Sequence, residues 1–336
     1  MSCRFSFPSG IDRRGWLVAM LLLPAVAQAQ WHRADATIMG TAIHVEVWHD
    51  DAEVAQHAIA AVLTEMRRID RQMSPYKPDS EVSRINRSAG VESVPVSAEL
   101  VGLIRKAERI SILTEGAFDI TFASAGHLYN YREGRRPAGS DLEAAVAAID
   151  YRQVTIDEQH SRITLNKSGM RVDLGGIAKG YAVERCAALL RARGIEHALI
   201  SAGGDTRVVG NREGRPWVVG VRHPRQDRNL ITRIPLEDEA ISTSGDYERF
   251  FEEQGTRYHH ILNPATGDSA REVISVTVVG PDATSTDALS TSVFVMGAER
   301  GLALVNRLPG YEALVMDRAG KLRYSAGLQP SQASSQ

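Results

Sequence analysis

A short stretch in the second half of the chain, VDLGGIAKGYAV at 172–183, combines an acid, two adjacent glycines and a lysine. Gly175 and Gly176 would let the backbone approach a ligand closely, and a helix that begins after them would direct free N–H groups toward an anion. Lys179 could add a positive charge one turn into that helix. The stretch matches neither the dinucleotide fingerprint nor the P-loop pattern, so a phosphate site and a tight strand-to-helix turn both stay open.

A second candidate lies further along the chain, in TSTDALST at 284–291. Asp287 and Thr291 are four residues apart, so on a helix they share one face and could present two hard oxygen ligands to one ion. Such ligands suit Mg²⁺, which often shares its coordination with substrate phosphates. The spacing of Thr284 and Asp287 is equally typical of a helix-capping box, which is the structural alternative.

Two adjacent histidines, His259 and His260 in YHHILNPATG, form the third candidate. On a strand they would point to opposite faces, which argues against a shared metal ion. One of them could act as an acid or base, and either could equally be a satisfied surface group. Upstream, Thr243 and Asp246 again have the spacing of a capping box.

The candidates require strands and helices that alternate along the second half of the chain. Periodicity and turn residues predict one compact α+β unit. Gly194 is a natural end for the helix that follows the glycine pair. We expect strands at 41–48, 162–166, 197–205, 217–221, 231–235 and 273–280, a hairpin at 312–325, helices at 51–72, 97–114, 177–193, 245–254 and 286–307, and loops at 73–86 and 132–141.

The composition is that of an ordinary globular protein. The chain has 336 residues, of which 43% are hydrophobic and 24% charged, with a formal net charge of -2. Nucleic-acid binding relies on clustered Lys and Arg, and no such cluster stands out. The sequence therefore argues against nucleic acid as a partner.

The N-terminus is typical of a cleavable export signal at 1–29. Arg13 and Arg14 precede a short apolar run at 16–26 and the small residues AQA, and the run is too short to span a bilayer. The arginine pair resembles a twin-arginine signal. Cleavage would remove Cys3 and leave Cys186 without a disulfide partner. No cysteine follows the cleavage site for lipid attachment, so we expect a soluble periplasmic protein, with a disordered tail at 329–336.

Eight motifs, in this order, resemble the ApbE family of FAD:protein FMN transferases. The resemblance covers about residues 35–328 and implies an ApbE-type, T-fold-like domain at 30–328. It also implies an Mg²⁺-dependent enzyme that transfers FMN from FAD to a Thr or Ser hydroxyl of a target flavoprotein and releases AMP. The target would be an acceptor subunit of a membrane-associated redox complex. The alternatives are an FAD diphosphatase and a non-enzymatic flavin-delivery protein. The motifs are MGTAIHVEVW, MSPYKPDSEVSRIN, EGAFDIT, VDLGGIAKGYAVER, SAGGD, STSGDYERFF, YHHILNPATG and TDALSTSVFVMG.

The resemblance also assigns roles to individual residues. His260 and Asp287 would be catalytic, and Gly176, Asp287 and Thr291 would hold the metal ion. This chain has Asn263 where many relatives have an acid, and the substitution is compatible with a turn. The implied contacts to FAD fall on Met39, Tyr76, Ala117, Phe118, Asp119, Asp173, Lys179 and Ile261.

Overall fold

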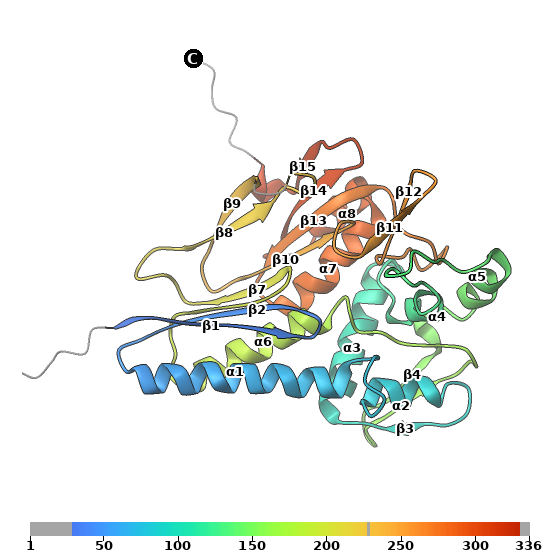
Figure 1. Cartoon of the computed structure of the whole chain (residues 1–336), viewed down its shortest axis with the longest axis horizontal. Helices are drawn as coiled ribbons and strands as arrows, with labels where there is room; N and C mark the ends of the chain where they lie inside the picture. The colour runs from blue at the N-terminus through green and yellow to red at the C-terminus, as the bar shows by residue number, and fades with distance from the viewer. Residues whose placement is uncertain (1–28, 227–228, 330–336) are drawn as a thin grey trace, which may run out of the picture.

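The computed structural model describes residues 29–226 and 229–329, which form a large antiparallel sheet with helices packed against it (Figure 1). Apart from Ala29, the predicted export signal lies outside the described residues, and so does the tail beyond Gln329. Within the two described ranges, no helix is both long enough and apolar enough to cross a membrane.

The main sheet has eight strands in the order β1-β2-β6-β7-β10-β13-β14-β15, and every neighbouring pair is antiparallel. Met39 and Gly40 have φ of 56° and 70° and form the two-residue turn between the first two strands. The strands are β1 (Gln30–Ile38), β2 (Thr41–His49), β6 (Ala198–Ala202), β7 (Asp205–Val209), β10 (Ala240–Gly245), β13 (Val273–Gly280), β14 (Glu312–Asp317) and β15 (Leu322–Tyr324).

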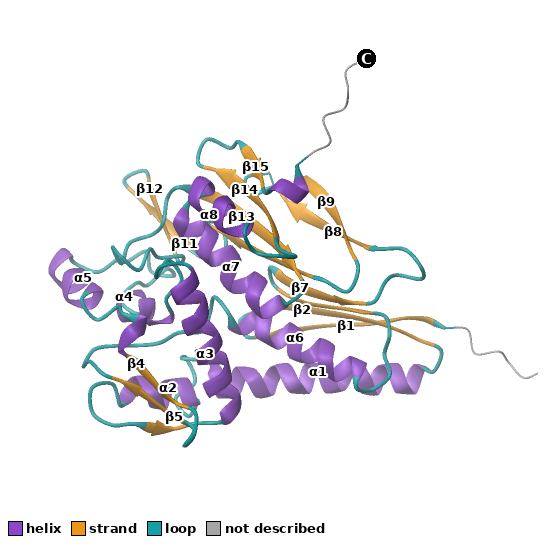
Figure 2. Cartoon of the chain, turned by 180° about the vertical axis from the view of Figure 1, so that it is seen from behind, coloured by secondary structure: helices purple, strands orange, loops and turns teal. Residues whose placement is uncertain are grey.

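Helices α1 (Ala52–Met73), α6 (Ala178–Arg191) and α7 (Ala283–Met296) lie along one face of this sheet (Figure 2). Their apolar sides share a core with the inward side chains of β2 and β6, including Val45, Val62 and Ile200. Helix α7 is followed by α8 (Ala298–Val305). Cys186 of α6 is buried in this core, and burial raises the pKa of its thiol to about 12.

A smaller layer packs beside the helices. It contains the three-stranded sheet β3-β5-β4, and Ile163 and Leu165 of β5 lie in one core with residues of α1 and α3. Its elements are α2 (Glu81–Arg87), β3 (Val94–Pro95), α3 (Ala98–Leu113), η1 (Ile120–Phe122), α4 (Ala123–Gly126), α5 (Gly139–Val146), η2 (Tyr151–Gln153), β4 (Val154–Asp157) and β5 (Arg162–Leu165).

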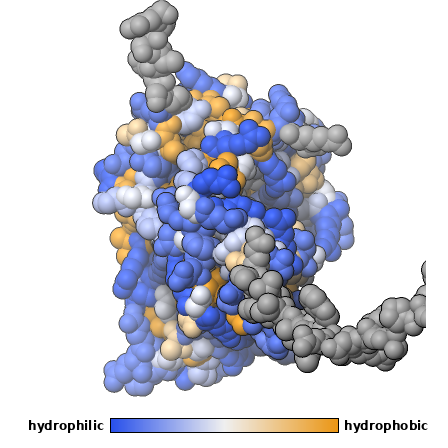
Figure 3. All heavy atoms as spheres, turned by 90° about the vertical axis from the view of Figure 1, so that its left-hand side faces the viewer, coloured by the Kyte–Doolittle hydropathy of each residue, from blue (hydrophilic) through white to orange (hydrophobic). Residues whose placement is uncertain are grey.

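A hairpin of β8 (Trp217–Arg222) and β9 (Leu230–Leu236) covers apolar side chains of the other face of the main sheet, and η3 (Ala326–Leu328) follows the last strand. Trp217 packs there with Ile241 of β10 and Leu314 of β14. The surface seen in Figure 3 is mainly hydrophilic, with apolar side chains scattered among polar ones, as is usual for a surface in contact with water.

The mixed α/β fold is confirmed, but three predicted elements are wrong. The predicted helix at 245–254 is a hairpin of β11 (Phe250–Glu253) and β12 (Thr256–His259). Its turn residues Gln254 and Gly255 both have positive φ, which fits a two-residue hairpin turn. The predicted loop at 73–86 contains the start of α2, capped by Ser80. The predicted helix at 286–307 is two helices, because Gly297 has φ of 81° between them.

Candidate active site

Helices α6 and α7 bring the predicted metal residues together. A Cβ atom built on Gly176 would lie 3.3 Å from Thr291 Oγ1, so the glycine backbone directly faces the threonine hydroxyl. One turn earlier on α7, the Asp287 carboxylate accepts a hydrogen bond of 2.9 Å from the Gly180 N–H. Asp287 and Thr291 therefore lie on one face of α7, toward the start of α6. Their role as metal ligands stays a prediction.

The close approach of the two helices depends on Gly180. A Cβ atom at this position would lie 2.2 Å from the Ala283 carbonyl oxygen and 2.6 Å from Asp287 Cβ. The capping-box interpretation of Thr284 and Asp287 is wrong, because Asp282 caps α7 by accepting from the Ser285 N–H at 2.7 Å. The Asp287 carboxylate therefore does not cap α7 and is instead directed at the first turn of α6, where it accepts from the Gly180 N–H.

Asp287 belongs to a buried charge cluster that sequence reasoning did not assemble. Lys179 Nζ pairs with the Asp205 carboxylate and lies 3.6 Å from Asp287 Oδ1. Asp205, at the start of β7, is 1% exposed and Asp287 is 2% exposed. Burial and the negative charge of Asp205 raise the pKa of Asp287 to about 7, although Lys179 opposes the rise.

Lys179 completes this cluster as its only cation within the described residues. Burial alone would lower the pKa of Lys179, but the carboxylates of Asp205 and Asp287 outweigh it and raise the pKa. The lysine is therefore charged, as a contact to phosphate requires. The SAGGD motif, which ends in Asp205, was the only sequence signal for the second carboxylate.

Hydroxyl groups of β10 face those of α7 from the sheet side. Ser244 Oγ lies 2.8 Å from Ser290 Oγ and 3.3 Å from Thr291 Oγ1, and Ser242 Oγ lies 2.8 Å from Thr286 Oγ1. The predicted capping box of Thr243 and Asp246 is wrong, because Thr243 lies within β10 and the Asp246 carboxylate pairs with Arg225.

The predicted segment at 117–119 lies next to the glycine pair. A Cβ atom on Gly176 would be 3.3 Å from the Phe118 ring, and the Asp173 N–H donates to the Ile120 carbonyl at 2.9 Å. Asp119 is engaged within the chain: its carboxylate accepts from the Thr121 N–H at 2.7 Å and the Tyr151 N–H at 2.9 Å. We conclude that Asp119 organises this segment, and a contact to FAD stays a prediction.

The two histidines occupy different environments, as expected for neighbours on an extended segment. His259 Nε2 lies 2.7 Å from the Ala270 carbonyl oxygen, so its ring is satisfied within the core. His260 Nδ1 is buried and has no partner among the described residues. Burial, together with the charges of Arg249 and Lys179, lowers the pKa of His260 to about 3, so its ring is neutral at physiological pH.

Two other residues that are predicted to contact FAD, Tyr76 and Ile261, differ in their exposure to solvent. Tyr76 is 79% exposed, whereas Ile261 is 6% exposed and packs in the core with residues of β13 and α7. The Ile261 N–H donates to His259 Nδ1 at 3.3 Å and its carbonyl accepts from the Ala270 N–H. Asn263 Oδ1 accepts from the Ala265 N–H at 2.9 Å, which fits its expected place in a turn.

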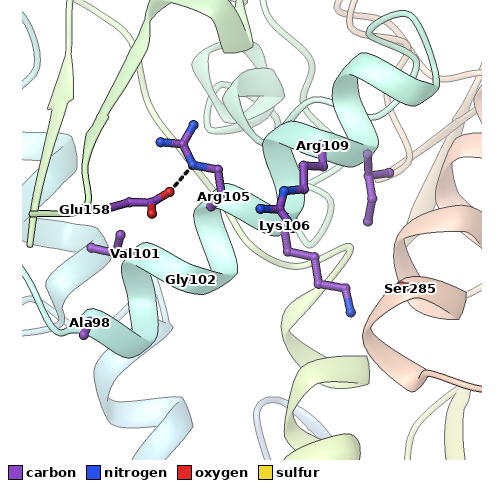
Figure 4. Close-up of a pocket in the computed structure, with 9 residues that line it drawn as sticks. Ala98, Val101, Gly102, Arg105, Lys106, Arg109, Glu158 and Ser285 are labelled. Atoms are coloured by element: carbon purple, nitrogen blue, oxygen red, sulfur yellow. Dashed lines mark hydrogen bonds and ion pairs between the residues drawn. The ribbon is translucent and has the colours of Figure 1, made fainter.

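A cavity of about 700 Å³ lies elsewhere, along α3 (Figure 4). Two of its three basic residues are paired with carboxylates: Arg105 with Glu158 at 2.6 Å and Lys106 with Asp282 at 2.6 Å. None of the predicted site residues lines it. The chemistry of the chain is therefore better placed at the start of α6.

Comparison with known proteins decides the family. The ApbE family model matches residues 39–315 of the chain. The chain belongs to the ApbE family. An FAD:protein FMN transferase of Vibrio cholerae is 35% identical, with 94% of this chain and 98% of the relative covered. One of Treponema pallidum is 33% identical, with 89% and 88% covered. With such relatives over most of its length, this ApbE-family chain is an enzyme.

Solved ApbE structures have the same fold. The ApbE protein of Thermotoga maritima superposes with a TM-score of 0.83 at 37% identity, covering 89% of this chain and 98% of that one. The flavin transferase ApbE of Vibrio cholerae superposes with a TM-score of 0.80 at 30% identity, again covering 89% and 98%. The mixed α/β architecture of this ApbE chain is therefore that of its family.

Proposed function

We propose that this enzyme transfers FMN from FAD to a Thr or Ser hydroxyl of a target flavoprotein through a phosphoester bond, with Mg²⁺ as cofactor and AMP as the leaving group. The transferase activity follows the relatives named above. The observation that carries the finer proposal is the meeting of Gly176, Asp287 and Thr291 beside Lys179.

The residues present fit Mg²⁺. Asp287 and Thr291 offer a carboxylate and a hydroxyl, and Gly176 offers a carbonyl oxygen, which are the hard ligands that Mg²⁺ prefers. Asp287 and Asp205 are buried and share one lysine, so a bound cation would balance the remaining negative charge. When bound, the ion supplies neutralisation of the FAD diphosphate. The described residues contain no group of three or more His, Cys, Asp or Glu side chains suited to a metal, so backbone and hydroxyl oxygens must complete this set.

The protein residues position the reacting groups. Lys179 lies beside Asp287 and would contact a phosphate oxygen of FAD. In the transfer, the acceptor oxygen forms a bond to the phosphorus that bears riboflavin, the bond from that phosphorus to the AMP oxygen breaks, and the hydroxyl proton is released. His260 Nδ1, unpaired and on a neutral ring, would accept a hydrogen bond from that hydroxyl and orient it.

The location and the partner complete the proposal. The N-terminal basic segment, apolar run and AQA tripeptide support export to the periplasm. There the acceptor would be a subunit of a membrane-associated redox flavoprotein.

The experiment is a transfer assay with the mature chain, FAD, Mg²⁺ and a protein carrying a Ser/Thr-Gly-Ala-Ser/Thr-like segment. We expect flavin fluorescence that stays with the acceptor after denaturing electrophoresis, and no label with Asp287→Asn. The Ser242→Ala variant, which removes a β10–α7 hydroxyl contact away from Thr291, is the matched control and should label the acceptor. FMN and AMP released without label would identify a diphosphatase, and intact bound FAD would identify a delivery protein.

A further inference from the structure

Arg249 lies just before β11 and contacts His260 of the candidate site. Its carbonyl oxygen accepts a hydrogen bond of 3.1 Å from the His260 N–H, which ties the two residues together at one end of the β11–β12 hairpin. The guanidinium reaches the turn between β1 and β2, because a Cβ atom on Gly40 would lie 3.5 Å from Arg249 Nη2. Its charge also acts on the Asp173 carboxylate and the His260 ring, and its N–H groups on the Tyr76 hydroxyl.

This arginine has no carboxylate of its own among the described residues. Its side chain is exposed, and no Asp or Glu of the described chain lies within 4.0 Å of its guanidinium. Its neighbours differ in this respect: Arg225 and Arg257 both pair with Asp246. An exposed guanidinium that lies beside the turn of Met39 and Gly40 and has no carboxylate partner among the described residues is suited to receive an anionic or strongly polar ligand.

The charge of the site makes a phosphate the better match. Asp173, Asp205 and Asp287 carry the carboxylates of this region, and Lys179, which already pairs with Asp205, is the other cation near His260. The charge of a divalent ion would only balance the net negative charge of these side chains. The diphosphate would then add further negative charge. Arg249, whose charge acts on both Asp173 and His260, is a second cation that would offset that charge.

We propose that Arg249 binds the diphosphate of FAD and so is a further substrate-binding residue. The inference rests on the proposed function. The planar guanidinium would make two parallel hydrogen bonds to phosphate oxygens, which a lysine could not reproduce. Arg249 would make no specific contact with the isoalloxazine ring. It would therefore strengthen the binding of phosphate-bearing ligands and not that of riboflavin.

Binding of two probes tests this assignment without any turnover. With Mg²⁺ present, Arg249→Gln should weaken ADP binding at least about tenfold, because charge-assisted hydrogen bonds to phosphate are lost. Riboflavin binding should change less than about twofold. The ADP affinity of Arg249→Lys should lie between those of the wild type and Arg249→Gln. Arg257→Gln, in the same hairpin but paired with Glu252 and stacked on Phe250, is the matched control and should leave both affinities unchanged.

Three results would separate the assignment from the proposed function. Equal losses for ADP and riboflavin would place Arg249 against the flavin ring and overturn the inference. Unchanged ADP affinity in both Arg249 variants would also overturn it, while wild-type binding of both probes would leave the transferase proposal standing. A wild-type protein that binds neither probe would overturn both. Circular dichroism of each variant checks folding, and the salt dependence of ADP binding, shallower in Arg249→Gln, gives a second readout.

Discussion

At the scale of single residues, the site combines groups that are costly to bury with groups that lack partners. Asp287 and Asp205 are nearly inaccessible and share one lysine, while His260 keeps an unpaired ring nitrogen. Such residues are seldom retained for stability alone, since an unpaired buried polar atom costs free energy. Their concentration at the start of α6 is therefore best explained by ligand binding.

Asp287→Asn separates function from stability. The amide keeps an acceptor for the Gly180 N–H but removes a negative charge beside Asp205. We expect turnover to fall by about 100-fold or more through loss of the metal ligand, with an unfolding free energy equal to or above that of the wild type. Transfer assays and urea denaturation measure the two quantities. A strongly destabilised variant that keeps its activity per folded molecule would show that Asp287 is structural.

His260 should give the protein a measurable sensitivity to acid. Its pKa is about 3 in the folded chain and near 6.5 when unfolded, so the unfolded chain takes up a proton as the pH falls below 6.5 and the folded chain does not. The wild type should therefore lose about 1–2 kcal/mol more stability than His260→Gln between pH 7.5 and 5. Denaturation curves at both pH values test this, and parallel losses in the two proteins would contradict a buried neutral ring.

At the scale of elements, the contact between α6 and α7 sets the geometry of the site. Gly180→Ala would place a methyl group against the Ala283 carbonyl and Asp287, and forcing the helices apart should cost about 1–3 kcal/mol. The matched control is Gly102→Ala in α3, where a Cβ atom meets nothing within 4 Å. There the better helix propensity of alanine should stabilise by roughly 0.5–1 kcal/mol. Equal effects of both substitutions in urea would contradict the close approach at Gly180.

The same scale shows what the sequence could predict. Long periodic segments could be predicted, because the helices near 52–73 and 98–113 and the strand at 273–280 follow from their own apolar patterns. The hairpin at 250–259 could not be predicted, because YERFFEEQ contains helix-forming residues. The pairing of the two strands depends on a turn at Gln254 and Gly255. That error also hid Arg249, since a helix there would not have placed it beside His260.

In the site, too, contacts within one helix could be predicted from the sequence, whereas contacts between distant elements could not. The shared face of Asp287 and Thr291 follows from helical spacing alone. The residue that caps this helix, Asp282, lies only two residues before the TSTDALST motif. The pairing of Lys179 with Asp205 joins elements that only the sheet order brings together, so no local pattern contains it. The resemblance to known motifs supplied a different distant relation, the grouping of Gly176 with Asp287 and Thr291.

At the scale of the whole molecule, the proposed metal site joins α6 to α7 and should stabilise the fold when filled. A ligand that binds only the folded state at about 100 times its Kd adds about 2.7 kcal/mol. We therefore expect saturating Mg²⁺ to raise the thermal midpoint by several degrees in the wild type and not in Asp287→Asn. Differential scanning calorimetry with and without EDTA measures the shift, and an identical shift in both proteins would place the ion elsewhere.

The most direct measurement is anomalous diffraction from crystals of the mature protein soaked with Mn²⁺ in place of Mg²⁺. We predict one peak bounded by the Gly176 carbonyl, the Asp287 carboxylate and the Thr291 hydroxyl, at roughly 2.0–2.3 Å from each oxygen. Crystals of Asp287→Asn should lack it. A fully occupied peak at other residues, with these three oxygens left uncoordinated, would contradict the account.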